Sequence, residues 1–170
     1  GGMKQKLALS CALIHKPTVL FLDEPTTGVD PVSRKEFWAM LKKLKAQGIS
    51  IIVSTPYMDE ASLCDRIALI QNGVFLEIDS PKNIVSKYKD RLLGVKADNM
   101  QKLLIDVRKF NNTKSSFAFG DSIHVKVNSL NFDTALLSNY LTEAGHKHIS
   151  IQDIAPSIED CFMELSESRF

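Results

Sequence analysis

The sequence predicts an α/β protein with a mixed or parallel sheet, followed by a small α+β domain. Two short apolar runs, at residues 19–22 and 49–55, are separated by a helical segment, which is the pattern of a β-α-β unit. Asn72-Gly73 lies between two further apolar runs, a strong signal for a β-hairpin. Beyond about residue 90 apolar and polar residues alternate, which is typical of half-buried strands.

The first helix is predicted over residues 7–14, which are strong helix formers, and Pro17 ends it. After the first strand, Asp30 stands immediately before a first-turn proline and is a good N-cap residue. In the segment that follows, apolar residues recur at helical spacing. Residues 31–47 are therefore expected to form an amphipathic helix that ends at Gly48.

The middle of the chain is predicted to hold short elements. They are a helix at residues 58–66, hairpin strands at 67–70 and 74–78, and a helix capped by Ser80. A charged run at residues 87–91 is the candidate boundary between a domain at 1–90 and another at 91–170.

The remaining elements follow the order β-α-β-β-α-β and end in a helix, which favours a ferredoxin-like sandwich. The expected elements are strands at 92–96, 115–119, 123–127 and 148–151, helices at 98–110 and 133–144, and a last helix capped by Ser157.

Composition argues against a nucleic-acid-binding protein, a disulfide or zinc scaffold and a membrane-spanning protein. The chain has 170 residues, 44% of them hydrophobic and 24% charged, with a formal net charge of +1. A nucleic-acid partner would leave a basic excess that is absent here. Cys11, Cys64 and Cys161 are far apart, so neither a disulfide framework nor a zinc site is indicated. No apolar run approaches a membrane span, so any membrane association is expected to go through a partner.

The candidate site centres on Asp23 and Glu24, which end the apolar run Val-Leu-Phe-Leu. A buried parallel strand would deliver both carboxylates to the carboxyl edge of its sheet, where α/β proteins bind ligands. Thr55 should reach the same edge from the next strand. Such a pair can hold Mg²⁺ beside nucleotide phosphates and position a water molecule. The alternative is an acidic loop with no more than a helix-capping role.

Gly1 and Gly2 precede the first helix, and glycines there can let backbone N–H groups approach an anion. The alternative is an expression scar in front of a start methionine.

Together, GGMKQKLALSCALIHKP, TVLFLDEPTTGVDP and IIVSTPYMDEA resemble the ATP-binding subunit of ABC transporters, at the expected spacing. The resemblance covers residues 1 to about 90 and implies the C-terminal part of a P-loop NTPase domain. The remainder looks like the accessory C-terminal domain of bacterial efflux ATPases, in a multidrug-export group with YbhF-like and CcmA-like proteins.

The resemblance assigns roles residue by residue. Asp23 resembles the acid that holds Mg²⁺ through water, and Glu24 the base that polarises the attacking water. Gly1 and Gly2 look like the end of the signature loop, which contacts the γ-phosphate of ATP held by the opposite subunit. Asp30 ends a segment that resembles the loop that communicates across the subunit interface.

The implied function is to couple ATP binding and hydrolysis to export by a partner permease. The implied cofactors are ATP and Mg²⁺, and the implied partners are a transmembrane permease and a second ATPase domain. The implied location is cytoplasmic, at the inner face of the cell membrane through the permease. Neither nucleic acid nor direct membrane insertion is expected.

Two departures from the family pattern limit this expectation. No G-x-x-x-x-G-K-[ST] loop occurs, and the sequence starts inside the signature motif, so we expect a C-terminal fragment that binds nucleotide weakly and does not turn over ATP alone. Pro56 stands where the family usually has a histidine, and its side chain cannot donate a hydrogen bond. We also expect self-association, because apolar strands would be left without sheet neighbours.

Other readings remain open. The chain could be a non-catalytic regulatory or interaction module, or a non-transport ABC protein, although the latter usually shows long heptad segments or a basic stripe. His146 and His148 would share one face of an extended segment, as in a metal site, but no third ligand is near in sequence. Surface histidines are the favoured interpretation.

Overall fold

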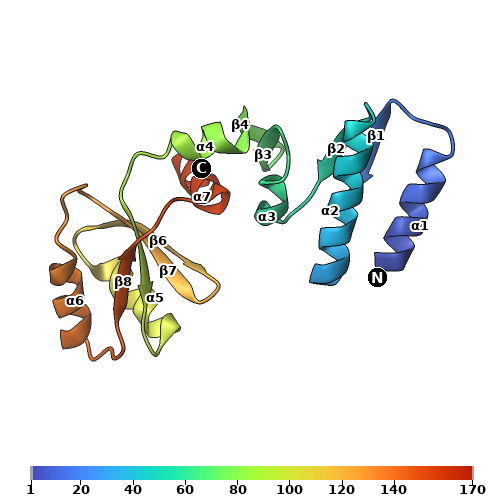
Figure 1. Cartoon of the computed structure of the whole chain (residues 1–170). Coiled ribbons are helices and arrows are strands. Elements are labelled where there is room, and N and C mark those ends of the chain that lie inside the picture. Colours follow the sequence, from blue (N-terminus) through green and yellow to red (C-terminus); the bar gives the residue numbers. More distant parts are fainter. Residues whose placement is uncertain (1, 170) are drawn as a thin grey trace. The chain divides into compact units, whose positions relative to one another are not determined.

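The computed structural model describes the backbone of residues 2–169 and the side chains of residues 2–167. It is a mixed α/β structure, as the sequence predicts (Figure 1). The chain divides into two compact units, and we describe each by itself. The N-terminal unit ends at Ile67, and the C-terminal unit begins at Ala68.

The N-terminal unit holds a β-α-β arrangement preceded by one helix. Its elements are α1 (Gly2–Leu13), β1 (Val19–Asp23), α2 (Pro31–Ala46), β2 (Ser50–Ser54) and α3 (Met58–Ala61). The two strands pair in parallel, with Val19 opposite Ser50 and Asp23 opposite Ser54. The predicted β-α-β unit is therefore confirmed. The expected burial of both strands is wrong, because Leu20 is the one buried residue of β1 and no residue of β2 is buried.

Local sequence signals account for α2. The Asp30 side chain accepts a hydrogen bond of 2.9 Å from the Ser33 backbone N–H, and Pro31 occupies the first turn. At the other end the helix stops before Gly48, whose φ of 92° only glycine adopts readily. The predicted cap and stop of this helix are both confirmed.

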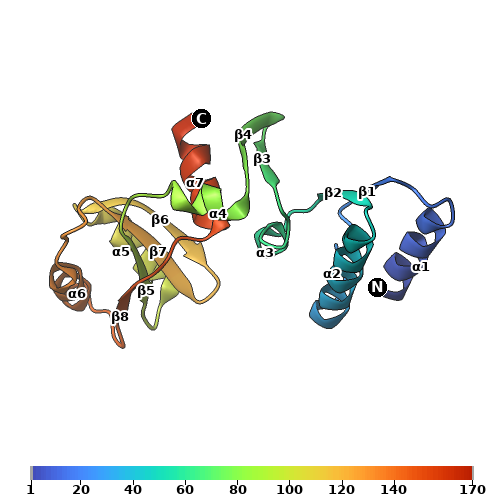
Figure 2. The same cartoon turned by 45° about the horizontal axis from the view of Figure 1, so that its top comes forward.

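The two faces of the β1–β2 sheet differ. One face carries a small core with both long helices, formed by Leu9 of α1, Leu20 of β1, and Phe37 and Leu41 of α2. Figures 1 and 2 show α1 and α2 side by side next to the strands. Because side chains alternate along a strand, Phe21 and Ile52 lie on the other face, where they are 73% and 55% exposed.

The C-terminal unit starts with a hairpin and continues into a larger sheet. Its elements are β3 (Ile67–Gln71), β4 (Val74–Asp79), α4 (Pro81–Ser86), β5 (Leu92–Lys96), α5 (Met100–Lys109), β6 (Thr113–Phe119), β7 (Ser122–Val127), α6 (Thr134–Glu143), β8 (Ser150–Asp153) and α7 (Ile158–Arg169). Strands β3 and β4 pair with each other. The turn between them is Asn72-Gly73, and both residues have positive φ, as the sequence predicts.

The larger sheet has the strand order β6-β7-β5-β8, and every neighbouring pair is antiparallel. The predicted order β-α-β-β-α-β is confirmed, and the ferredoxin-like assignment stays a prediction. Helices α5 and α6 cover one face of the sheet. The buried cluster there is formed by Leu93, Val95, Leu103, Val107, Ile123, Val125, Val127, Phe132, Leu137 and Leu141.

The opposite face of this sheet carries charged pairs with α7. Along β7, His124 and Lys126 alternate with the buried Ile123 and Val125. The His124 Nδ1 lies 2.7 Å from Asp160 Oδ1, and Lys126 Nζ lies 2.5 Å from Glu164 Oε1. The last helix is thereby attached to the sheet.

Helix α7 also contacts α4 and β4, so residues after 68 form one unit. The Cys161 thiol lies 3.8 Å from the Ile84 carbonyl oxygen. The compact units thus meet at residues 67–68, whereas the sequence suggested 90–91. The division lies there because α7, at the end of the chain, packs against β4 and α4. A charge pattern along the sequence does not reveal this long-range contact. The domain limits drawn from the resemblance stay a prediction.

Three predicted elements need correction. Helix α3 covers only four residues, Met58–Ala61, instead of nine. Strand β8 begins at Ser150 and not at 148, because His148 has a φ of 52°, outside the extended region. Helix α5 begins at Met100, since Asn99 rather than an earlier residue accepts the capping hydrogen bond.

Two further properties concern the whole described chain. None of the helices within residues 2–169 has the length and apolar character needed to cross a bilayer. Cys11, Cys64 and Cys161 are free thiols. Burial raises the pKa of Cys161 to about 11, so this thiol stays protonated at neutral pH.

Candidate functional site

The two candidate carboxylates lie at the carboxyl ends of the parallel strands. Asp23 ends β1 opposite Ser54, which ends β2, and the Ser54 hydroxyl donates a hydrogen bond to Asp23 Oδ1. The backbone N–H of Glu24 donates to the Ser54 carbonyl oxygen at 3.0 Å and lies 3.1 Å from its hydroxyl oxygen. Both acidic residues are exposed. The structure thus places them at the edge where the sequence puts them.

Glu24 adopts an uncommon backbone conformation. Its φ is 43°, in the left-handed region that residues with a Cβ atom enter at a cost of roughly 1–2 kcal/mol. The backbone bonds to Ser54 hold it there, and the Thr27 hydroxyl donates to Glu24 Oε2 at 3.0 Å. The carboxylate is therefore held by a defined turn.

A groove runs from this turn along α1. It has a volume of about 400 Å³ and is lined by Gln5, Leu9, Phe21, Asp23, Glu24 and Phe37, among others. Its walls are mostly apolar, and the two carboxylates supply the acidic part of its lining. The Gln5 side-chain oxygen is buried without a hydrogen-bond partner.

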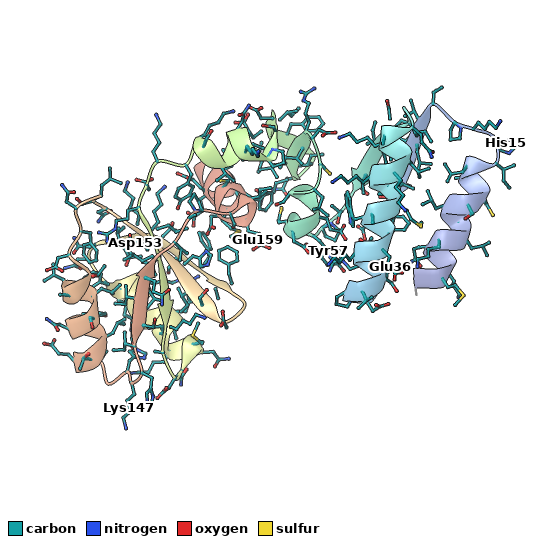
Figure 3. All side chains as sticks on the ribbon, viewed as in Figure 1. His15, Glu36, Tyr57, Lys147, Asp153 and Glu159 are labelled. Atoms are coloured by element: carbon teal, nitrogen blue, oxygen red, sulfur yellow. The ribbon has the colours of Figure 1, made fainter. Side chains whose placement is uncertain are left out.

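Beside this turn lies a buried network that the sequence did not reveal. Glu60 in α3 is only 1% exposed, and its Oε1 accepts hydrogen bonds from Thr26 Oγ1 at 2.7 Å and Arg34 Nε at 3.0 Å. Its Oε2 accepts from Thr55 Oγ1 at 2.7 Å. The Arg34 guanidinium also lies 4.2 Å from the ring centre of Tyr57, which Figure 3 labels.

The charges in this network compensate one another. Burial raises the pKa of Glu60, but hydrogen bonds from donors that include Thr26, Thr55 and Arg34 outweigh it and hold the pKa below its usual value. Burial lowers the pKa of Arg34, and the contacts with Glu60 and Asp59 more than reverse this. Glu60 is therefore ionised at neutral pH, and its charge is paired.

Sequence reasoning missed Glu60 because it treated the residues around it as an ordinary short helix. The only available signal was the pair Asp59-Glu60 directly after the segment that carries Pro56. Nothing in the local pattern indicates that Glu60 turns inward while Asp59 stays exposed. That difference depends on residues some thirty positions earlier, since Thr26 and Arg34 are separated from Glu60 by 34 and 26 residues.

The other predicted site residues are placed as follows. Gly1 lies outside the described residues. A Cβ atom on Gly2 would come within 2.5 Å of Ser33 Cβ, so the close approach of α1 to α2 requires a glycine there. Asp30 is exposed and caps α2, and hydrogen bonds from Ser33 lower its pKa. Pro56 is exposed and follows Thr55 directly.

The residues at the strand ends fit a magnesium ion that is shared with nucleotide phosphates. Such an ion takes one or two protein carboxylates and keeps several waters. The exposed Asp23 carboxylate, oriented by the Ser54 hydroxyl, meets this requirement. Within residues 2–169, no three side chains of the His, Cys, Asp and Glu types gather as a metal-binding group, so a closed protein-only metal cage is not present there.

The histidines of the C-terminal unit each pair with an aspartate. His148 is exposed, as expected for a surface histidine, and its Nδ1 lies 2.8 Å from Asp98 Oδ1. The expectation of a surface position is wrong for His146, which is 7% exposed with its Nε2 2.9 Å from Asp106 Oδ2. The backbone turns at His148, so the two rings do not share a strand face.

The chain is similar to several ATP-binding proteins of ABC transporters. It is 47% identical over 83 residues to the probable multidrug ABC transporter ATP-binding protein YbhF of Escherichia coli (strain K12), covering 49% of this chain and 14% of that protein. It is 32% identical over 169 residues to the Nod factor export ATP-binding protein I of Rhizobium sp. (strain N33), covering 98% of this chain and 53% of that protein.

A third relative is the linearmycin resistance ATP-binding protein LnrL of Bacillus subtilis (strain 168). It is 29% identical over 172 residues, which cover 98% of this chain and 55% of LnrL. The chain spans about half the length of the curated relatives that it matches from end to end. No family model matches the chain.

Proposed function

We infer that this chain, which belongs to the family of ABC transporter ATP-binding proteins, supplies the carboxylate side of an ATP-hydrolysing site. One observation carries the inference. Asp23 and Glu24 lie together at the carboxyl ends of two adjacent parallel strands, held by Ser54. Ligands of open α/β sheets bind at that edge.

Each residue then has a separate task. Asp23 is the residue that would hold Mg²⁺ through water, and the ion would neutralise phosphate charge. Glu24 accepts a hydrogen bond from the attacking water and polarises it. Its turn, fixed by Ser54 and Thr27, presents the carboxylate without a large entropic cost.

The remaining residues belong to the interface with a second ATPase domain. Gly1 and Gly2 are proposed to lie near the γ-phosphate of ATP held by that second domain, and Asp30 on the loop that faces it. The close packing of Gly2 on α2 and the capping role of Asp30 support a fixed position for both segments.

In the complete protein, the site is proposed to drive export of a substrate through a transmembrane permease. The names of relatives that refer to multidrug transport, Nod factor export and linearmycin resistance support export as the direction. The complete protein would then be cytoplasmic and bound to the inner face of the membrane through the permease, with ATP and Mg²⁺ as its cofactors.

Pro56 points to low intrinsic activity. Its side chain has no donor for a γ-phosphate oxygen. We propose that this site is weakly hydrolytic, with Pro56 lowering its turnover below that of a site with histidine at position 56. Pro56→His in the complete protein should raise ATP turnover, and an unchanged rate would contradict this.

A second candidate is a non-catalytic regulatory or interaction module. The large closed core formed by residues between 93 and 141 favours an independent role for the C-terminal part, because it needs no nucleotide site to fold. On the domain limits that the resemblance implies, residues 1–90 would then be scaffold and residues 91–170 would bind a ligand or partner.

ATP hydrolysis by the complete protein with and without Glu24→Gln separates the two. The substitution should lower kcat by about 10²-fold or more while ATP binding persists, because the general base is lost. Glu143→Gln, a change of an exposed glutamate in α6, is the matched control and should leave kcat unchanged. If the wild-type protein binds no Mg-ATP, the module is the better description.

A further inference from the structure

Glu60 joins three segments that are distant in sequence. Thr26 belongs to the turn after β1, Arg34 to the first turns of α2, and Thr55 to the segment after β2. All three donate hydrogen bonds to the one carboxylate, at 2.7, 3.0 and 2.7 Å. Thr26 is itself 1% exposed, so the junction is shielded from water.

The two segments held by the hydroxyl donors both lead to the candidate site. Thr26 is two residues after Glu24, and Thr55 lies between Ser54 and Pro56. Ser54 in turn holds the backbone N–H of Glu24 and the Asp23 carboxylate. Two contacts therefore fix the turn that carries Glu24. The Glu24 N–H bonds to Ser54 at the strand edge, and the Thr26 hydroxyl bonds to the buried Glu60.

A carboxylate suits this junction better than a neutral side chain. Its two oxygens accept three donors, and Arg34 compensates its charge, which would otherwise be costly to bury. Arg34 also forms paired contacts of 3.1 and 3.2 Å with Asp59, whose side chain is 75% exposed. The exposed aspartate therefore touches the same arginine but neither threonine in this network.

We propose that Glu60 is a positioning residue that sets the location of Glu24 relative to residue 56. It contacts no substrate and acts through Thr26 and Thr55. Its effect on hydrolysis rests on the function proposed above, whereas its linkage of the two segments does not. The proposal predicts that loss of the Glu60 carboxylate frees both segments together.

Amide hydrogen exchange on this chain tests the linkage without any nucleotide. In Glu60→Gln, exchange of the N–H groups of Glu24 and residues 26–28, and of Thr55 and Tyr57, should rise together by about tenfold, because hydrogen bonds to a charged group are lost. The matched control is Asp59→Asn, which removes a neighbouring charge from the same arginine and should leave both segments unchanged.

A second pair of variants covers the case in which Glu60→Gln does not fold. Thr55→Val removes one donor to Glu60 and also the acceptor of the Tyr57 N–H, while Thr55→Ser keeps the hydroxyl. Thr55→Val should raise exchange at residues 24–28, and Thr55→Ser should restore the protection. An effect confined to residues 55–57, or a uniform rise over the whole N-terminal unit, would overturn the linkage.

ATP turnover by the complete protein tests the consequence. Glu60→Gln should lower kcat by about 10²-fold, as small displacements of a catalytic group do, and leave the KM for ATP within about twofold. Asp59→Asn should leave both constants unchanged. Full kcat in a Glu60→Gln protein whose two segments exchange faster would overturn the positioning role. If the wild-type protein does not hydrolyse ATP, the proposed function fails, and the exchange data alone decide the linkage.

Discussion

The two units of this chain bury their sheets in different ways. In the C-terminal unit, ten residues form a cluster under α5 and α6, and most of them have no exposed surface. The N-terminal unit has a four-residue cluster and leaves one sheet face with Phe21 largely exposed. A four-stranded sheet with two helices closes its own core, whereas two parallel strands cannot. We therefore expect the C-terminal unit to be the more stable one, while the N-terminal unit carries the candidate site.

The largest stability effect should come from the closed core. Leu137→Ala in α6 removes a side chain with 0% exposure and should cost about 2–5 kcal/mol of the C-terminal unit's unfolding free energy. Its neighbour Leu136 is 54% exposed, so Leu136→Ala should cost within about 0.5 kcal/mol. Chemical denaturation of both variants gives the comparison. Equal losses would show that this core does not carry the unit's stability.

The buried charge of the N-terminal unit should make that unit sensitive to acid. The pKa of Glu60 is held below its usual value of 4.5, so its ionised form stabilises the folded state above that pH. That stability is lost as the pH falls through the lower, folded-state pKa. Glu60→Gln should lower stability by about 1–3 kcal/mol at pH 7, and the difference should vanish in acid. Urea titrations from pH 7 to pH 3 measure it.

Exposed Asp59 supplies the control for the acid experiment. Its side chain is 75% exposed, so Asp59→Asn should change stability little. A Glu60→Gln protein whose deficit stays constant down to pH 3 would show that the charge of Glu60 is not the cause.

A smaller effect is expected at the start of α2. Asp30→Ala removes the acceptor for the Ser33 N–H and should lower the stability of the N-terminal unit by less than Glu60→Gln does. Lys35→Ala, in the exposed part of the same helix, should be near neutral. Thermal unfolding followed by helical circular dichroism distinguishes the two.

The smallest stability effect should accompany a clear change in association. Phe21→Lys puts a charge on the uncovered sheet face and should alter stability within about 0.5 kcal/mol, while it lowers the self-association that the exposed strands favour. Leu130→Lys, at an exposed leucine of the C-terminal unit, should not lower it. Light scattering over a concentration series measures this. Equal association of all three proteins would mean that the uncovered face is not involved.

Local chemistry predicted most elements and the position of the acidic pair. Asp30-Pro31 and Ser80-Pro81 mark helix starts, and Asn72-Gly73 marks a hairpin, because each pattern satisfies or fixes the backbone within a few residues. The apolar run before Asp23 indicated a strand that ends in carboxylates. These features need no knowledge of the rest of the chain.

The same reasoning failed where distant segments decide the outcome. Helix α3 ends after four residues, where nine were expected. Its Glu60 bonds to Thr26, in the turn after β1, and to Arg34 of α2. The compact units divide between residues 67 and 68, and α7 returns to contact α4 within the second unit, while the domain limits at 90–91 stay a prediction. Neither contact has a local signature.

By itself, the sequence determined the order of elements, the strand-end carboxylates and the family. Only the tertiary structure decided that Glu60 is buried while Asp59 is exposed, that His146 pairs with Asp106 inside the C-terminal unit, and that Glu24 takes a left-handed turn. The physical reason is that caps and turns are satisfied by near neighbours. The ionisation and position of a buried polar group are set by partners that only folding brings within hydrogen-bond distance.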